Sequence, residues 1–430
     1  MEASAGRPGR VQGTVAPGFE SVKQLYEREM QTMAETNTQL CVYHKGEKVV
    51  DLWASVTSDP QFTPDSIVNV FSSGKSLEAI AMGWLAGRGL VDYGAKIADY
   101  WPEFAAHGKH ELTVADLMRH EGGMAAFRTS LDPEDLLTEN LKQNKVGRVI
   151  ESHALRFPTG GRGRREYHAI TRGWIVNEVF RRLDPRGRTL GEFLREEISG
   201  PLEADAIIGV EEADLPRVSK VVPLGFGFQF LQSLKPRILG RKIVHNFLQL
   251  LGRLLRIIPG LRHATTRGAP APYKGMKGIR FFNEPAVARG ETPSAAANCS
   301  ARGLAKIAAM MSAGGRWGER EYLTEKGWKA LHENPVAADM GFTGTNFTQG
   351  GVNLFSEVGA RASVLERAFN AGREGFYGWM GLGGSIFQWH PRHEIGFGFV
   401  PTSLHVLDIL NERGKVYQAE VLRCVERLTR

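Results

Sequence analysis

Apolar residues follow two different periods along the chain, and the short-period runs gather near its two ends. Short apolar runs bounded by turn residues are typical of β-strands. Two of them near the start are separated by K-G-E (Lys45–Glu47), which is a hairpin signal. The runs with this character are Gln39–Tyr43, Lys48–Trp53, Ile67–Phe71, Phe376–Trp379, Ser385–His390 and Ile395–Val400.

Helical periodicity fills the interval between the strand-like runs and also flanks them. The segments with this period are Phe19–Glu35, Ser72 to Gly87, Val114–His120, much of 133–200, Ala301–Met311, Thr324–His332 and Leu407–Leu428. We therefore predict an α/β fold of the α+β type, in which both chain ends build one antiparallel sheet and a mainly helical subdomain is inserted. The expected boundaries are a disordered N-terminus at 1–12, a sheet domain at 13–95 and 290–430, a helical subdomain at 96–214, and a basic amphipathic insertion at 215–289.

The insertion carries the basicity of the chain. The formal net charge is +7, yet no acidic residue occurs between Asp214 and Glu284, where 13 Lys and Arg occur; without them 41 basic residues face 47 acidic ones, a net charge of −6. Because the basicity is local, it does not indicate a nucleic-acid partner.

An amphipathic helix is predicted at the centre of the insertion, over Gly240–Ile258, with Pro259-Gly260 as its stop. Its apolar stripe is Val244, Phe247, Leu248, Leu251, Leu254, Leu255 and Ile258. Two interpretations are open: a helix packed on its own domain with a solvated basic face, or an interfacial helix or lid, within 235–262, that contacts an anionic membrane or an acyl chain.

Composition limits the remaining classes of function. The 430 residues are 42% hydrophobic and 23% charged, as in soluble globular proteins. Three separated cysteines, without a C-x-x-C or Cys/His cluster, argue against a disulfide framework or zinc site and for a reducing compartment. No apolar run reaches transmembrane length and the N-terminus lacks a secretory signal, so we expect a cytoplasmic protein, with mitochondrial or membrane-peripheral locations as alternatives.

The candidate chemistry lies in V-F-S-S-G-K-S (Val70–Ser76), between an extended run and a helical one. On the first turn of a helix, Ser72 and Lys75 share one face, so their side chains are within reach of each other. A desolvated lysine can be neutral enough to activate a serine, and a helix N-terminus offers N–H groups to an oxyanion. On spacing alone, however, a helix cap with a solvated lysine explains the motif as well.

Further motifs stand in a distinctive order along the chain. They are L-T-V-A-D-L-M-R-H-E-G-G-M (Leu112–Met124), Y-H-A (Tyr167–Ala169) and G-L-G-G-S-I-F-Q-W-H-P (Gly381–Pro391). With these motifs the chain resembles the serine β-lactamase-like family, which comprises class C β-lactamases, esterases and DD-peptidases, and most of all its esterase branch. The resemblance covers residues 13–215 and 290–428, and it implies the β-lactamase/DD-peptidase fold.

The resemblance implies a role for each matching residue. Ser72 is the acylated serine, Lys75 takes its proton, and Tyr167 shares the base and proton-relay work, with Lys75 lowering the pKa of the phenol. Gly381 matches the glycine of the strand beside the serine, where the N–H groups of Leu382 and Ser72 form an oxyanion hole. The family's mechanism requires no cofactor and no metal.

Two departures from the family pattern bear on the substrate. Ala169 replaces the asparagine of Y-x-N, and Trp379 replaces the lysine or histidine that precedes the strand glycine. Without that cation the usual partner of a substrate carboxylate is lost, which favours a neutral ester or amide with an apolar acyl group. We therefore expect a serine hydrolase working through an acyl-enzyme. The alternatives are a weakly active or inactive scaffold or self-assembling protein and, with less support, a peptidase or true β-lactamase.

Overall fold

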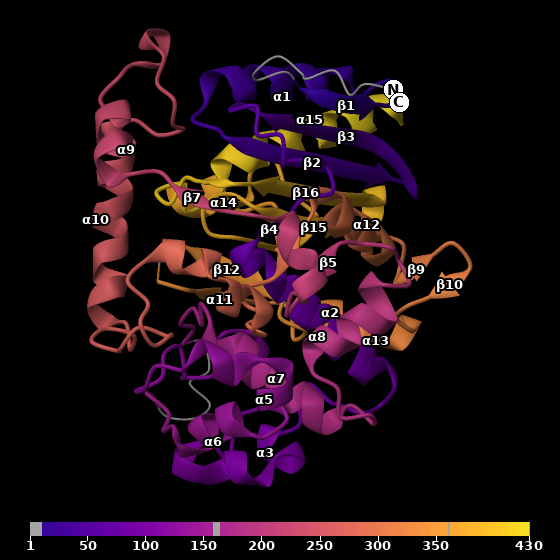
Figure 1. Ribbon diagram of the computed structural model, residues 1–430, viewed down its shortest axis with the longest axis vertical. Coiled ribbons are helices and arrows are strands. Elements are labelled where there is room, and N and C mark those ends of the chain that lie inside the picture. Colours follow the sequence, from indigo (N-terminus) through magenta and orange to yellow (C-terminus); the bar gives the residue numbers. More distant parts are fainter. Residues whose placement is uncertain (1–10, 158–163, 342, 360–361, 430) are drawn as a thin grey trace.

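One antiparallel sheet of nine strands runs through the computed structural model, which describes residues 11–157, 164–341, 343–359 and 362–429 (Figure 1). The strand order is β1-β3-β2-β16-β15-β14-β13-β12-β11, so strands from the two chain ends meet at its centre, as predicted. The strands are β1 (Gln12–Val15), β2 (Asn37–His44), β3 (Glu47–Ser55), β11 (Val336–Asp339), β12 (Gly344–Phe347), β13 (Asn353–Leu354), β14 (Tyr377–Met380), β15 (Ile386–His390) and β16 (Ile395–Pro401).

Helices cover both faces of this sheet. In the part of the chain that the structure describes, the α-helices are α1 (Glu20–Thr32), α2 (Lys75–Gly87), α3 (Ile97–Tyr100), α4 (Val114–Met118), α5 (Thr138–Leu141), α6 (Lys145–Ser152), α7 (Thr171–Leu183), α8 (Leu190–Phe193), α9 (Phe226–Ser233), α10 (Phe247–His263), α11 (Pro285–Arg289), α12 (Ala301–Ser312), α13 (Glu325–His332), α14 (Val364–Asn370) and α15 (Glu412–Leu428). Within the described residues, no helix combines the length and the apolarity that crossing a membrane requires.

Strand periodicity decides which face of the sheet each helix covers. Along β16, Ile395, Phe397 and Phe399 point to one face and pack with α1 and α15 in a single hydrophobic cluster. Gly396 and Gly398 point to the other face, against α12, where an added Cβ would lie 2.3 Å from a backbone atom of Ala309 and 2.4 Å from one of Ala301. Glycine therefore lets α12 approach the centre of the sheet closely.

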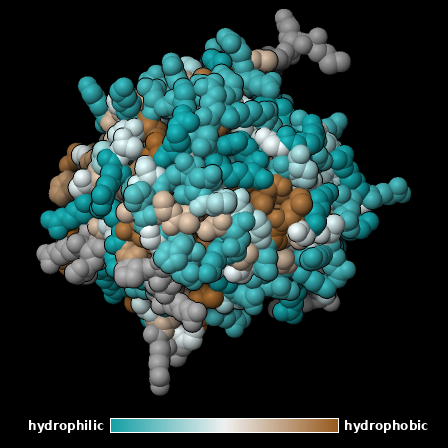
Figure 2. Space-filling view, turned by 90° about the horizontal axis from the view of Figure 1, so that it is seen from below, coloured by the Kyte–Doolittle hydropathy of each residue, from teal (hydrophilic) through white to brown (hydrophobic). Residues whose placement is uncertain are grey.

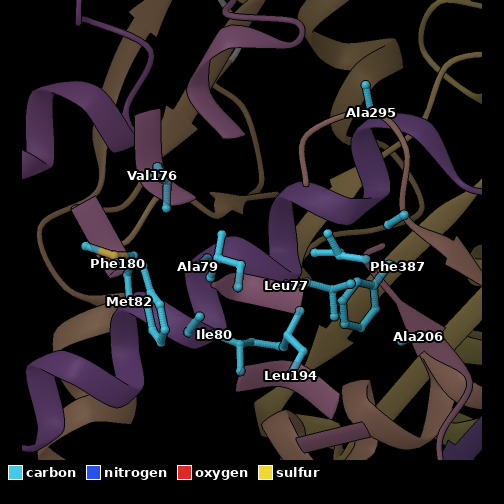
Figure 3. Close-up of a cluster of buried hydrophobic side chains, with 14 of the residues drawn as sticks. Leu77, Ala79, Ile80, Met82, Val176, Phe180, Leu194, Ala206, Ala295 and Phe387 are labelled. Atoms are coloured by element: carbon cyan, nitrogen blue, oxygen red, sulfur yellow. The ribbon is translucent and has the colours of Figure 1, made fainter. Parts of the chain in front are cut away.

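Helix α2 crosses the interior between the sheet and the helical part of the chain. All of its residues from Lys75 to Ala86 are buried. A helix that is apolar on every side is expected to be enclosed, and Figure 3 shows Leu77 and Ile80 of α2 among side chains from α7, β15 and the turn after α8. The start of α2 is thereby held at a fixed place under the sheet.

Short strands connect the helical part to the sheet. A mixed four-stranded sheet has the order β5-β8-β4-β6, and two strand pairs, β7 with β17 and β9 with β10, complete the set. Their bounds are β4 (Ile67–Asn69), β5 (Ala206–Ile207), β6 (Val218–Ser219), β7 (Val222–Pro223), β8 (Asn298–Cys299), β9 (Arg316–Trp317), β10 (Arg320–Glu321) and β17 (Ser403–Leu404). The predicted domain boundaries stay predictions.

Two helices begin later than predicted because side chains cap a later turn. The closing helix was expected from Leu407, but the Asp408 carboxylate accepts hydrogen bonds from the N–H groups of Glu412 and Arg413, both 2.9 Å, and α15 starts there. In the insertion, Asn246 and Gln249 exchange side-chain-to-backbone hydrogen bonds of 2.9 Å, which is a capping box.

The capping box starts α10 at Phe247 instead of Gly240, and α10 runs past the predicted stop to His263. At the N-terminus, residues 1–10 of the segment predicted to be disordered lie outside the described residues. The same prediction is wrong at Gln12, which begins β1.

Candidate active site

Ser72 lies on a 3₁₀ turn, Phe71–Gly74, immediately before α2, rather than on the first helical turn as predicted. The turn follows β4 after one residue and begins with an unusual backbone: Phe71 has φ +47°. A bulky residue in this left-handed region is strained. The Asn69 side chain holds it there by accepting a hydrogen bond from the Phe71 N–H at 2.7 Å. The chain therefore bends sharply beside the serine.

Lys75, the first residue of α2, points its amine at the serine. Its Nζ lies 3.3 Å from Ser72 Oγ, 2.7 Å from the Ala169 carbonyl oxygen and 3.0 Å from the Ser294 carbonyl oxygen. The alanine that replaces the family's asparagine thus still supplies an acceptor from its backbone. The two side chains are therefore within hydrogen-bonding distance, as the sequence predicted.

Burial sets the charge of Lys75. The side chain is enclosed, and this desolvation holds the pKa of its amine well below the ordinary 10.5, while Glu78 raises it and Arg172 lowers it further. A neutral amine has two N–H groups and one lone pair. Two carbonyl oxygens can accept the two N–H groups, and the lone pair is then left for the Ser72 hydroxyl.

Tyr167 reaches the same serine from the loop before α7. Its hydroxyl is hydrogen-bonded to Ser72, and it accepts a hydrogen bond of 2.9 Å from Trp379 Nε1. Burial raises the pKa of Tyr167 to about 12, although the hydrogen bonds to Ser72 and Trp379 lower it in part. The expectation that Lys75 would make this phenol phenolate-like is therefore wrong, and Tyr167 is a neutral phenol at neutral pH.

The donors and acceptors of these four side chains form a directed series. An indole N–H only donates, so Tyr167 Oη is the acceptor from Trp379 and its own proton is free to point at Ser72. The charged Lys75 amine donates to Ser72 Oγ, whereas the neutral amine, which burial favours, can accept the Ser72 proton on its lone pair. Trp379 is thus part of the hydrogen-bonded site, a role that its comparison with the family's lysine or histidine did not reveal.

Gly381 lies just beyond the end of β14, rather than within a strand, and touches the serine turn. A Cβ at this position would be 2.1 Å from the Val70 carbonyl oxygen, so only glycine allows this approach. The next N–H, that of Leu382, donates to no acceptor among the described residues. The first hydrogen bond of the serine turn runs from the Ser73 N–H to the Val70 carbonyl oxygen, 3.1 Å. The Ser72 N–H precedes this bond, so the turn itself gives it no acceptor.

A buried ion pair between Arg172 and Glu78 contacts the backbone of Lys75. Arg172 Nε donates to Glu78 Oε2 at 2.9 Å, both side chains are inaccessible to solvent, and Arg172 also donates to the Lys75 carbonyl oxygen at 3.1 Å. Ser294 donates its hydroxyl to Glu78 and its carbonyl accepts from Lys75. None of these residues was singled out from the sequence, although Glu78 stands three residues after Lys75 on a strongly apolar helix.

His120 also faces the site without forming a metal centre. Its ring lies 4.8 Å from that of Tyr167, and burial holds its pKa well below 6.5, so it is neutral. Among the described residues, the group that could hold a metal is His245, Asp408 and Glu412.

The Arg253 guanidinium already contacts two members of that group. It lies 3.0 Å from the His245 ring and 2.8 Å from the Glu412 carboxylate. Because this cation supplies the positive charge, the group is best described as an ion-pair cluster.

Comparison with known proteins identifies the family of the chain. The family model described as Beta-lactamase matches residues 22–416. Among curated proteins, the chain is 28% identical over 408 residues to Esterase/beta-lactamase LipL of Mycobacterium tuberculosis, covering 93% of this chain and 84% of that protein.

Solved structures show the same fold over nearly the whole chain. A family VIII carboxylesterase superposes with a TM-score of 0.74 at 24% identity, covering 96% of this chain and 100% of the other. A penicillin-binding protein homologue from Caulobacter crescentus gives a TM-score of 0.69 at 22% identity, covering 95% and 100% of the two chains. EstA from Arthrobacter nitroguajacolicus gives 0.69 at 23% identity, covering 98% and 100%.

Proposed function

The chain belongs to the beta-lactamase family and is a serine hydrolase of it, and we propose that it hydrolyses neutral esters with an apolar acyl group through an acyl-enzyme on Ser72. Amides of the same kind are included in the proposed substrate class. The observation that carries the proposal is the hydrogen-bonded series Trp379, Tyr167, Ser72 and Lys75. It places the serine hydroxyl beside a lysine whose pKa burial holds well below its ordinary value, which favours the neutral amine.

In the proposed reaction, Ser72 Oγ attacks the substrate carbonyl carbon while its proton moves to Lys75 Nζ. The N–H groups of Ser72 and Leu382 bind the oxyanion, and its collapse breaks the ester C–O bond. The leaving alcohol receives the proton from Lys75, with Tyr167 as the relay. Water then attacks the acyl-enzyme, the same base takes its proton, and Ser72 is restored.

The walls of the site support a neutral substrate. Where the family has a lysine or histidine, Trp379 presents a buried indole whose N–H is already used by Tyr167. The rings of Phe347 and Trp379 lie 4.9 Å apart, and His120 is neutral. A substrate carboxylate would be desolvated among these rings without a cation at position 379, so the peptidase and true β-lactamase alternatives are disfavoured.

The test is labelling by a fluorophosphonate probe, which phosphonylates an activated serine. Wild type should be labelled and should hydrolyse short-chain p-nitrophenyl esters, whereas Ser72→Ala should do neither. Ser73→Ala is the matched control, because the neighbouring hydroxyl is engaged by Ser385 at 3.0 Å and should be dispensable.

Labelling that persists in Ser72→Ala would assign the nucleophile elsewhere. A wild-type protein with neither labelling nor turnover would favour the scaffold alternative. Cytoplasmic location stays a prediction from the sequence. A peripheral contact of 235–262 with an anionic membrane is a separate proposal, which does not depend on the chemistry at Ser72.

A further inference from the structure

Helices α9 and α10 form an arm, here the α9–α10 arm (226–263), that lies along one side of the molecule (Figure 1). The two helices contact each other through the edge-to-face rings of Phe230 and Phe247, 6.0 Å apart. The Gln232 side chain also accepts a hydrogen bond from the Lys242 N–H at 2.9 Å. The arm therefore has internal packing of its own and is a defined structural element.

The arm exposes apolar side chains that a protein normally buries. Within the described part of the chain, most large hydrophobic residues that are exposed lie between Phe226 and Leu255. Ile238 is 93% exposed, Leu248 75%, Phe226 72% and Leu255 60%. The interpretation that the predicted stripe packs on its own domain is therefore wrong for Leu248 and Leu255. A concentration of this kind marks an interaction surface.

Figure 2 shows apolar side chains at the left edge of the surface, on the side where Figure 1 places α9 and α10. Much of the remaining surface in that view is hydrophilic, and a separate apolar patch lies to the right of its centre.

Positive charge surrounds these apolar residues. Lys235, Arg237, Lys242 and Arg256 are exposed, and no acidic side chain of the described residues forms an ion pair with them. The sequence from Leu215 to Asn283 contains no acidic residue. Two arms placed against each other would bring like charges together, whereas an anionic lipid surface complements the charge and accepts the apolar side chains.

The arm is tied to the protein near the candidate active site. At its far end, the Thr265 N–H and hydroxyl both donate to the carboxylate of Glu166, the residue before Tyr167, at 2.7 and 2.6 Å. In its middle, Arg253 pairs with Glu412 of α15 at 2.8 Å. The segment that follows the arm is therefore hydrogen-bonded to the residue next to Tyr167.

A cavity also lies between α10 and an aromatic side chain that packs on Trp379. It has a volume of about 680 Å³ and is lined by Arg256, by residues of β11 and β12, and by Phe369. The Phe369 ring packs edge-to-face on Trp379, with centroids 6.0 Å apart. The exposed arm and the indole that hydrogen-bonds Tyr167 are thus separated by one aromatic ring and a cavity.

We infer that the α9–α10 arm docks the protein on an anionic membrane surface, with its leucine and phenylalanine side chains in the lipid interface and its lysines and arginines at the headgroups. The docking itself is independent of the chemistry at Ser72. Its consequence for substrate, which rests on the proposed function, is that the hydrolysed esters are lipid-borne ones, delivered from the membrane to a site beside the arm.

Vesicle sedimentation tests the docking without any activity readout. The wild-type protein should bind vesicles of phosphatidylcholine with about 30% phosphatidylserine, bind pure phosphatidylcholine much less, and dissociate as NaCl rises toward about 1 M. Leu248→Glu should weaken partitioning at least about tenfold, and adding Leu255→Glu about a hundredfold, because each leucine loses its transfer from water. Both side chains are exposed, so folding should be unaffected.

Two further variants separate the parts of the surface. Leu428→Glu changes an apolar residue that is also exposed, 53%, but lies outside the arm, and it should bind like wild type. Replacing Lys235, Arg237, Lys242 and Arg256 by glutamine should reduce the preference for anionic vesicles by about a thousandfold, because four charges at roughly 1 kcal/mol each total about 4 kcal/mol and each step of about 1.4 kcal/mol is a factor of ten. Binding that is unchanged by these replacements would overturn the proposal.

Light scattering on the same proteins tests a second copy as the occupant. If wild type is a dimer that Leu248→Glu converts to a monomer, without any vesicle binding, then the arm is an interface between copies and the membrane proposal is overturned. A wild-type oligomeric state that Leu248→Glu leaves unchanged, together with vesicle binding, supports it.

Activity separates this inference from the proposed function. Leu248→Glu should hydrolyse soluble p-nitrophenyl butyrate like wild type but lose turnover of a p-nitrophenyl ester carried in anionic vesicles. If wild type binds vesicles but hydrolyses neither ester, the proposed function fails and the docking stands. If both esters are hydrolysed but no vesicle is bound, the docking fails alone.

Discussion

Replacing Trp379 by phenylalanine tests the hydrogen-bonded series at its first member. Phenylalanine keeps an aromatic ring against Phe347 and Phe369 but removes the single N–H that donates to Tyr167 Oη at 2.9 Å. The indole is 3% exposed, so solvent does not readily replace the lost donor. The Tyr167 hydroxyl then loses the contact that directs its proton toward Ser72.

The size of the effect follows from that one bond. A buried hydrogen bond contributes about 0.5–1.5 kcal/mol, and an acceptor left without a donor costs about 1–3 kcal/mol. When this cost falls on the transition state, each 1.36 kcal/mol is a factor of ten in rate, so kcat should fall about 5- to 100-fold. The pKa of Tyr167, which Trp379 now lowers, should rise further.

The assay is hydrolysis of p-nitrophenyl butyrate beside urea unfolding, with Trp389→Phe as the matched control. Trp389 is fully buried and its Nε1 also donates one bond of 2.9 Å, but to His332. Both variants should lose similar stability, while only Trp379→Phe should lose kcat. An unchanged kcat in Trp379→Phe, or an equal loss in Trp389→Phe, would refute the reasoning.

Three further changes test the rest of the site. Because burial lowers the pKa of Lys75, its amine becomes a base as pH rises through that lowered value, and the acid limb of the pH–kcat profile should lie well below 10.5. A limb at 10.5 would contradict the assignment of Lys75 as the base. Lys75→Arg, which is always charged, should be inactive at every pH. Gly381→Ala should reduce both kcat and thermal stability, since its Cβ would lie 2.1 Å from the carbonyl oxygen of Val70, the residue before the serine turn. Gly227→Ala, with nothing within 4 Å, should change neither, and a fully active Gly381→Ala would show that the close approach is not needed. Glu78→Gln should lower the free energy of unfolding, measured in urea, by about 3–5 kcal/mol, because it leaves the Arg172 charge buried without its partner. A loss below about 1 kcal/mol would contradict a stabilising role for this ion pair.

The sheet could be predicted well because strand periodicity and turn chemistry are local. The hairpin of β2 and β3 was indicated by its two apolar runs and by K-G-E. The meeting of strands from both chain ends was predicted from the helices that lie between them. The helix starts were less predictable, because a single side chain decides them. Asp408 and Asn246 cap the N-termini of α15 and α10, and the helices begin there although the apolar periodicity extends further back. The periodicity alone therefore does not locate the helix start.

The candidate site divides in the same way. Ser72, Lys75 and Tyr167 stand in motifs, and the structure brings these three together. From the sequence, Trp379 was interpreted only as the loss of the family's lysine or histidine. Its role depends on the direction of the indole N–H toward Tyr167, which the sequence does not give. Arg172 was not found at all, since its pairing with Glu78 joins residues 94 positions apart. For α10, periodicity located the apolar stripe but not what the stripe contacts.

The pairing of β2 with β16 has a consequence for biosynthesis. Strand β2 (Asn37–His44) can pair only once β16 (Ile395–Pro401) has been synthesised, so the centre of the sheet forms after roughly 350 more residues have been translated. This takes about 20–70 s at usual ribosomal rates. During that interval the β2–β3 hairpin has an uncovered apolar face and an unpaired edge, the features that bind chaperones or aggregate. A nascent chain stopped before β16 could not close the sheet at its centre.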